Sequence, residues 1–144
     1  MIIGIDFDGT CVTHEFPAVG KEIGAVPVLK ELTDKGHQLI LFTMRSHLKS
    51  CRSATNAEGY EAIELETDVL NDAVEWFCKN EIPLFGINEN PDQKSWSDSP
   101  KPYCHLYIDD AALGCPLKID KDMSDRPFVD WDGVRTLLMI NGVI

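Results

Sequence analysis

The sequence predicts a three-layer α/β sandwich built on a doubly wound, mainly parallel sheet, formed as a single domain over residues 1–144. Short apolar segments alternate along the chain with segments of helical periodicity. This alternation implies parallel strands joined by right-handed crossovers. The length of 144 residues, with 44% hydrophobic and 26% charged side chains, is typical of one globular domain with its own core.

The first predicted element is a buried strand at residues 1–5, because this apolar segment is bounded by a turn signal. Asp6 and Asp8 follow it, and side chains two residues apart on an extended chain point to one face. Gly9 allows the backbone to turn directly afterwards. Ligands bind at the carboxyl ends of strands in open α/β sheets. Two neighbouring carboxylates there repel each other unless a cation joins them, so they predict a Mg²⁺ site.

The remaining elements follow from the same patterns. A helix is predicted at residues 25–35, ended by Gly36, and a second strand at residues 37–42. Residues 44–65 are the least readable, and the polar stretch 50–61 is a candidate lid. Further along, the patterns predict a helix at 67–80 capped by Thr67 or Asp68, strands at 84–87 and 103–108, a short edge strand at 117–119, and a final helix capped by Asp130 or Asp132.

Polar residues stand at the ends of other predicted strands. Thr43 ends the second strand, Asp109 and Asp110 follow the strand at 103–108, and Lys101 lies just before that strand. Together with the Asp6-Phe7-Asp8-Gly9-Thr10 segment, and in this order, these residues resemble the four signatures of the haloacid dehalogenase (HAD) superfamily. The resemblance spans residues 1 to about 113. Asp8 matters within it, because phosphatases of the superfamily carry this second Asp and its dehalogenases lack it.

The resemblance implies a Mg²⁺-dependent phosphomonoester hydrolase that acts through an aspartyl-phosphate intermediate. Asp6 would be the nucleophile. Asp8 would protonate the leaving oxygen and then deprotonate the attacking water. Mg²⁺ would be held by Asp6, by the backbone carbonyl of Asp8 and by Asp109. Asp110 would support the metal waters or Lys101.

The resemblance also assigns the phosphate-binding residues. The Thr43 hydroxyl would donate to a phosphate oxygen and Lys101 would neutralise developing charge. Gly9 and Thr10 would complete the phosphate site. Two assignments stay open. Lys94 is an alternative to Lys101, and Arg45 either supports the site by reaching the phosphate or leaving group, or has a structural role.

The intervals between the signatures leave little room for a second domain. Thirty-three positions separate Thr10 from Thr43, and 58 separate Thr43 from Lys101. Neither interval accommodates a separate cap domain of the kind that many HAD phosphatases carry. In that family, missing caps often accompany large substrates or oligomers, so a homo-oligomer is possible. The loop at residues 11–22 would flank the site, where His14, Glu15 and Phe16 are either substrate contacts or ordinary loop residues.

The bulk composition excludes several classes of protein. A net charge of −11 argues against a nucleic-acid partner. A small phosphorylated substrate is what the resemblance to HAD phosphatases implies. No apolar run approaches the ~18 residues of a membrane span, so no membrane association is expected. The N-terminal segment lacks the features of a signal peptide. The five cysteines form no C-x-x-C pair, which favours reduced thiols and a cytoplasmic location.

Two other functions remain as alternatives. A HAD-fold protein that keeps the pocket but serves as a binding or regulatory subunit would carry the same residues without turnover. A receiver-like phospho-acceptor domain also combines an acidic pocket, a Thr and a Lys on a doubly wound sheet. The order of the motifs disfavours the receiver, because here the acidic pair follows the fourth strand and no Asp ends the third.

Overall fold

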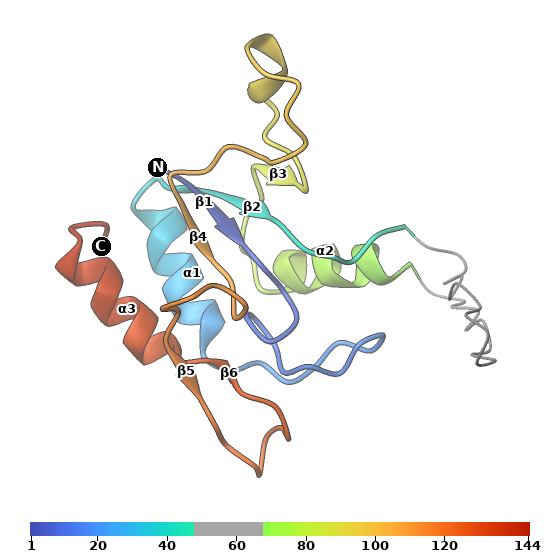
Figure 1. Cartoon of the computed structure of the whole chain (residues 1–144), viewed down its shortest axis with the longest axis vertical. Helices are drawn as coiled ribbons and strands as arrows, with labels where there is room; N and C mark the ends of the chain where they lie inside the picture. The colour runs from blue at the N-terminus through green and yellow to red at the C-terminus, as the bar shows by residue number, and fades with distance from the viewer. Residues whose placement is uncertain (48–67) are drawn as a thin grey trace.

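The computed structural model describes residues 1–47 and 68–144, so the candidate lid at 50–61 lies outside the described residues. Figure 1 shows the arrangement of the elements. In chain order they are β1 (Ile2–Ile5), α1 (Ala25–Asp34), β2 (Gln38–Leu41), α2 (Val69–Lys79), β3 (Gly86–Ile87), the short 3₁₀ helix η1 (Gln93–Ser95), β4 (Leu106–Ile108), β5 (Leu117–Lys118), β6 (Phe128–Val129) and α3 (Trp131–Ile140).

The central sheet has four strands in the order β3-β2-β1-β4, and every neighbouring pair is parallel. Ile5 of β1 is in register with Leu41 of β2 on one side and with Ile108 of β4 on the other. The residues that follow these three positions therefore emerge together at one edge of the sheet. The predicted α/β class and the mainly parallel sheet are confirmed.

The helix boundaries agree with the sequence patterns. Asp68 caps α2, because its carboxylate accepts the backbone N–H of Asn71 at 3.1 Å. Gly36 follows α1 with a φ of 81°, a left-handed conformation that favours glycine after a helix. Asp130 is the N-cap residue of α3. Asp68 locates a helix end because it supplies a partner for a backbone group that the helix itself leaves unpaired. The side chain of Asp130 makes no such capping bond.

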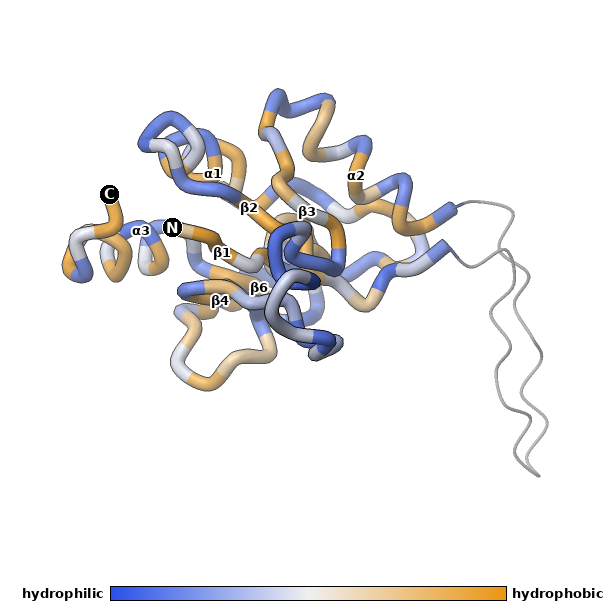
Figure 2. Tube along the Cα trace, turned by 90° about the horizontal axis from the view of Figure 1, so that it is seen from above, coloured by the Kyte–Doolittle hydropathy of each residue, from blue (hydrophilic) through white to orange (hydrophobic). Residues whose placement is uncertain are grey.

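The main core lies on one face of the sheet. Apolar side chains of the three helices form one buried cluster with alternate residues of the strands, namely Ile3, Ile5, Leu39, Leu41 and Ile108. Figure 2 shows α1 and α2 on the same side of the sheet, and α3 lies beside α1, where Arg135 pairs with Glu31. In the described residues no helix covers the opposite face. The helix layer that the sequence predicted for that face is therefore not found in this part of the chain.

The path of the chain explains this difference. The steps from β1 through α1 to β2, and from β2 through α2 to β3, run in one direction across the sheet, and right-handed crossovers then place both helices on one face. The return from β3 to β4 contains only η1. Side chains such as Ile40 and Tyr107 occupy the opposite face, and a Cβ at Gly4 would lie 2.7 Å from the Tyr107 ring.

The predicted edge strand at 117–119 is present as β5, but it does not join the main sheet. It pairs with β6 in an antiparallel two-stranded sheet, and the sequence patterns gave no signal for β6. This small sheet supports the turn after β1, since the Val129 amide donates to the Gly9 carbonyl at 2.9 Å. The Trp131 indole at the start of α3 donates to the Thr10 carbonyl at 2.7 Å. Both bonds fix the backbone beside Asp6 and Asp8.

None of the helices in residues 1–47 and 68–144 combines the length and apolar character that a membrane span requires.

Candidate active site

A pocket of about 390 Å³ lies at the carboxyl ends of β1, β2 and β4. It is lined by Asp6, Asp8, His14, Phe16, Thr43, Met44, Arg45, Asp109, Asp110 and Ala111. A larger cavity, of about 480 Å³, lies between β4 and α3, but no Asp, Glu, Lys or Arg side chain lines it. The ionisable side chains gather in the first pocket, so it is the candidate site.

Three carboxylates form the floor of this pocket. Oxygen atoms of Asp6, Asp109 and Asp110 lie within 4.8 Å of one another. The pKa of Asp6 is raised from 3.8 to about 7, chiefly because burial disfavours the charged carboxylate. Hydrogen bonds from the Phe7 amide and the Thr10 hydroxyl oppose this shift, and the charges of Asp109 and Asp110 add to it. A cluster of hard oxygen donors that repel one another suits a divalent cation such as Mg²⁺. These residues therefore fit a metal site, and Asp110 belongs to the cluster itself.

Thr10 and Gly9 shape this floor, whereas the sequence assigned them to phosphate. Thr10 is fully buried. Its hydroxyl donates a hydrogen bond to Asp6 Oδ2 at 2.9 Å and accepts a hydrogen bond from the backbone amide of Asp110 at 3.0 Å. It therefore ties the end of β1 to the end of β4. Gly9 has a φ of 85°, and a Cβ there would lie 2.1 Å from His14 Nε2. Its missing side chain leaves room for the contact between His14 and Asp110.

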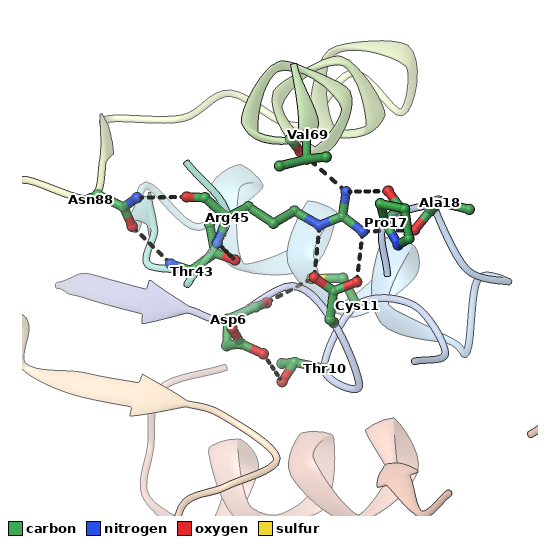
Figure 3. Close-up of polar contacts among 10 residues, drawn as sticks. Asp6, Thr10, Cys11, Pro17, Ala18, Thr43, Arg45, Val69 and Asn88 are labelled. Atoms are coloured by element: carbon green, nitrogen blue, oxygen red, sulfur yellow. Dashed lines mark hydrogen bonds and ion pairs between the residues drawn. The ribbon is translucent and has the colours of Figure 1, made fainter. Parts of the chain in front are cut away.

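Arg45 forms the wall of the pocket beside Asp8. Its Nε donates to Asp8 Oδ2 and its Nη2 to Asp8 Oδ1, both at 2.7 Å. The guanidinium also donates to the carbonyls of Ala18 at 2.7 Å, Val69 at 3.1 Å and Pro17 at 3.3 Å, as Figure 3 shows. Arg45 is 2% exposed. Of the two roles left open by the sequence, the structural one agrees with these contacts.

The same contacts change the expectation for Asp8. Both of its carboxylate oxygens are engaged by Arg45, and its side chain lies outside the cluster formed by Asp6, Asp109 and Asp110. The two carboxylates that follow β1 therefore have different surroundings. Asp6 lies among other carboxylates, whereas the charge of Asp8 is neutralised by the buried guanidinium of Arg45. Each carboxylate oxygen of Asp8 accepts one hydrogen bond from Arg45, so proton transfer would use the lone pairs that these two bonds leave free.

Thr43 lies in the pocket as the sequence predicted, and Asn88 orients it. The amide of Thr43 donates to Asn88 Oδ1 at 2.8 Å, and the Thr43 hydroxyl oxygen accepts the Arg45 amide at 3.2 Å. Within residues 1–47 and 68–144 that hydroxyl donates to no protein acceptor, so its proton is placed to meet a ligand. Asn88 is not among the residues predicted from the sequence, although it directly follows β3 and thus obeys the same strand-end rule as Thr43.

The loop after β1 contributes two residues to the pocket. His14 Nε2 lies 3.0 Å from Asp110 Oδ2, and the Phe16 ring centroid lies 5.4 Å from the Arg45 guanidinium carbon. Glu15 does not line the pocket and instead accepts a hydrogen bond from Thr13. Of the three loop residues considered, His14 and Phe16 are placed to meet a ligand.

Neither candidate lysine lines the pocket. Lys101 Nζ lies 4.9 Å from the centroid of the Tyr107 ring, and Lys94 pairs with Glu89 at 3.3 Å. Both residues precede β4, so their backbone lies toward the amino end of a strand whose carboxyl end forms the site. The sequence expectation for Lys101 does not agree with this placement. Of the pocket-lining residues that the structure describes, Arg45 and His14 are the cationic candidates.

Comparisons with known proteins support the fold. A solved structure of a conserved protein from Bacteroides thetaiotaomicron matches with a TM-score of 0.66 and 28% sequence identity, covering 99% of this chain and 91% of that one. No model of a protein family matches the chain, and no curated protein does.

Proposed function

We propose that this chain is a Mg²⁺-dependent phosphomonoester hydrolase of the HAD type, without a separate cap domain, which acts on a small phosphorylated substrate in the cytoplasm. The observation that carries the proposal is the cluster of Asp6, Asp109 and Asp110 at the carboxyl ends of two adjacent parallel strands. The strand order β3-β2-β1-β4 and the motif order along the chain support it.

In this proposal Asp6 is the nucleophile. Its carboxylate attacks phosphorus, the bond to the leaving oxygen breaks, and an aspartyl-phosphate forms, which water then hydrolyses. Asp6, Asp109 and Asp110 would hold Mg²⁺, which supplies positive charge between the carboxylates and the phosphate. Thr43 would donate its hydroxyl to a phosphate oxygen. Thr10 holds Asp6 in place through the bond to Oδ2.

The proton steps involve Asp8 in this scheme. It would give a proton to the leaving oxygen and later take one from the attacking water. Arg45 donates one hydrogen bond to each carboxylate oxygen of Asp8, so the scheme uses the lone pairs that these bonds leave free and a carboxylate held in one orientation. Arg45 is therefore a positioning residue for Asp8.

Hydrolysis of a generic aryl phosphate with and without Mg²⁺ tests the proposal. We expect turnover that requires Mg²⁺, that is abolished by a chelator and that returns when the metal is restored. Turnover that persists in the chelator would contradict a metal-dependent mechanism. No turnover of aryl, sugar or nucleoside phosphates with saturating Mg²⁺ would contradict the enzyme assignment.

The placement of Lys101 leads to a specific expectation. Because its ammonium lies over Tyr107 and outside the pocket, we expect Lys101→Ala to change kcat/KM by less than about threefold, within the range of surface contacts. Lys94→Ala is the matched control. A loss of a hundredfold or more in Lys101→Ala alone would show that Lys101 reaches the phosphate during catalysis.

Mg²⁺ should stabilise the fold more at pH 8 than at pH 5.5. The pKa of Asp6 is raised to about 7 in the folded protein, so the folded state binds more protons than the unfolded state between about pH 4 and 7. Without metal, stability therefore falls as the pH rises through this range. Mg²⁺ competes with this proton and offsets the loss at high pH. Melting curves with and without Mg²⁺ at both pH values measure the difference, and an equal increase in Tm at both would contradict the expectation.

Binding without turnover is the second candidate function. The observation in its favour is that Asp8, the expected proton shuttle, is held by Arg45 at both oxygens, while Lys101 lies outside the pocket. A protein of this kind would bind Mg²⁺ and a phosphate mimic without hydrolysing any monoester. The two functions are separated by measuring, on one preparation, whether Mg²⁺ supports turnover of a monoester and whether Mg²⁺ raises the Tm.

A further inference from the structure

The mouth of the pocket differs in chemical character from its floor. Phe16 is 53% exposed and Met44 is 96% exposed, and both line the pocket whose floor holds the acidic cluster. Large apolar side chains exposed at the entrance of a charged pocket favour ligands that have one charged and one apolar end. If the phosphate of a monoester meets the floor, its leaving group faces Phe16 and Met44.

Phe16 is held in place at this entrance. Its ring packs against the guanidinium of Arg45, at 5.4 Å from the ring centroid, and Arg45 also contacts the Phe7 ring at 5.0 Å. Arg45 in turn binds the carbonyls of Pro17 and Ala18, the residues that follow Phe16. The exposed half of the ring is thus a fixed planar surface. Met44 carries a flexible, polarisable thioether that adapts to an aromatic partner.

The charges of the pocket disfavour a second anionic group. Four of the lining side chains are carboxylates, those of Asp6, Asp8, Asp109 and Asp110. Among the described lining residues, the guanidinium of Arg45 is engaged by Asp8 and the imidazole of His14 by Asp110. With a neutral imidazole at His14, one guanidinium and one divalent cation supply three positive charges against the four negative charges of the carboxylates. A leaving group with its own phosphate or carboxylate would therefore enter a negative field.

Building on the proposed phosphatase function, we propose that the pocket selects phosphomonoesters whose leaving group is uncharged and presents a planar aromatic face to Phe16 and Met44. Stacking on Phe16 and the sulfur–aromatic contact with Met44 supply the preference for an aromatic ring. The unbalanced carboxylates supply the discrimination against bisphosphates and other polyanions.

Binding of phosphonates tests this selectivity without requiring turnover, since their C–P bond is not hydrolysed. Benzylphosphonate, ethylphosphonate and 4-carboxybenzylphosphonate differ in the ring and in the added charge. With saturating Mg²⁺, we expect calorimetry to give a Kd for benzylphosphonate roughly tenfold lower than for the other two. Phe16→Leu and Met44→Ala should each reduce this preference. Trp96→Ala removes an aromatic ring that is 62% exposed outside the pocket and should leave the preference unchanged.

The outcomes separate this inference from the proposed function. Equal affinities for benzylphosphonate and ethylphosphonate, or no binding of either, would overturn the selectivity. So would a preference that survives in both Phe16→Leu and Met44→Ala. Mg²⁺-dependent turnover of monoesters with no benzyl preference would leave the phosphatase intact and remove only the leaving-group assignment. A benzyl preference without turnover of any monoester would support the pocket and contradict the enzyme.

Discussion

If the proposed function holds, Asp6→Asn is expected to lower kcat toward phosphomonoesters by at least ~10³-fold, because a neutral amide replaces the carboxylate that we propose as the nucleophile. The fold should be unaffected. The amide oxygen of Asn still accepts the Thr10 hydroxyl, and the substitution removes a carboxylate whose burial raises its pKa to about 7. We therefore expect a Tm equal to or above that of the wild type at pH 8 without metal. Steady-state kinetics and a melting curve on the same preparation measure both effects.

Asp109→Asn serves as a matched control, because it removes one charge from the same cluster without removing the nucleophile. It should weaken activation by Mg²⁺, and excess metal should restore part of the rate. Asp6→Asn should not recover at any Mg²⁺ concentration. Wild-type turnover by Asp6→Asn, with an unchanged melting curve, would rule out Asp6 as the nucleophile.

Arg45→Met is expected to produce the largest loss of stability of any single substitution in the site. The change keeps a long apolar side chain but leaves the half-buried Asp8 carboxylate and the carbonyls of Pro17, Ala18 and Val69 without their buried donor. Breaking a buried ion pair on one side costs about 3–5 kcal/mol. For a chain of this length that corresponds to a fall in Tm of roughly 10 °C or more. Thermal unfolding monitored by calorimetry provides the measurement.

Arg135→Met is the control for this change. Arg135 makes the same two-bond contact to Glu31, with Nε–Oε2 at 2.8 Å and Nη2–Oε1 at 3.1 Å, but at the surface. Solvent replaces these bonds when they are lost, so Tm should change little. Adding Asp8→Asn to Arg45→Met should recover part of the stability, since it removes the unpaired charge. Equal losses in Arg45→Met and Arg135→Met would contradict a buried clamp.

The parts of the site that the sequence predicted are those determined by the backbone. In a parallel sheet the carboxyl ends of neighbouring strands meet at one edge, so apolar segments followed by Asp6, Thr43 and Asp109 indicated which side chains converge. The same rule applied to the third strand would have identified Asn88. Capping signals located the helices equally well, because Asp68 and Gly36 act on backbone groups next to them in the sequence.

The parts that the sequence did not predict depend on side-chain contacts between distant segments. Asp8 and Arg45 are 37 residues apart, and nothing in this spacing indicates that two guanidinium nitrogens of Arg45 bind both carboxylate oxygens of Asp8. Lys101 has a suitable spacing before Asp109, but it precedes β4, and its ammonium rests on Tyr107. The expected second helix layer depended on the connection from β3 to β4, which contains η1 and no longer helix.

Trapping the covalent intermediate would show whether Asp6 attacks phosphorus in a metal-assisted reaction. Wild-type protein mixed with excess aryl phosphate and Mg²⁺ would be quenched in acid during turnover, digested and examined by mass spectrometry. We expect one phosphoryl group on the peptide that contains Asp6, absent when Mg²⁺ is chelated and absent in Asp6→Asn. Phosphorylation of another residue, such as His14, in place of Asp6 would contradict it.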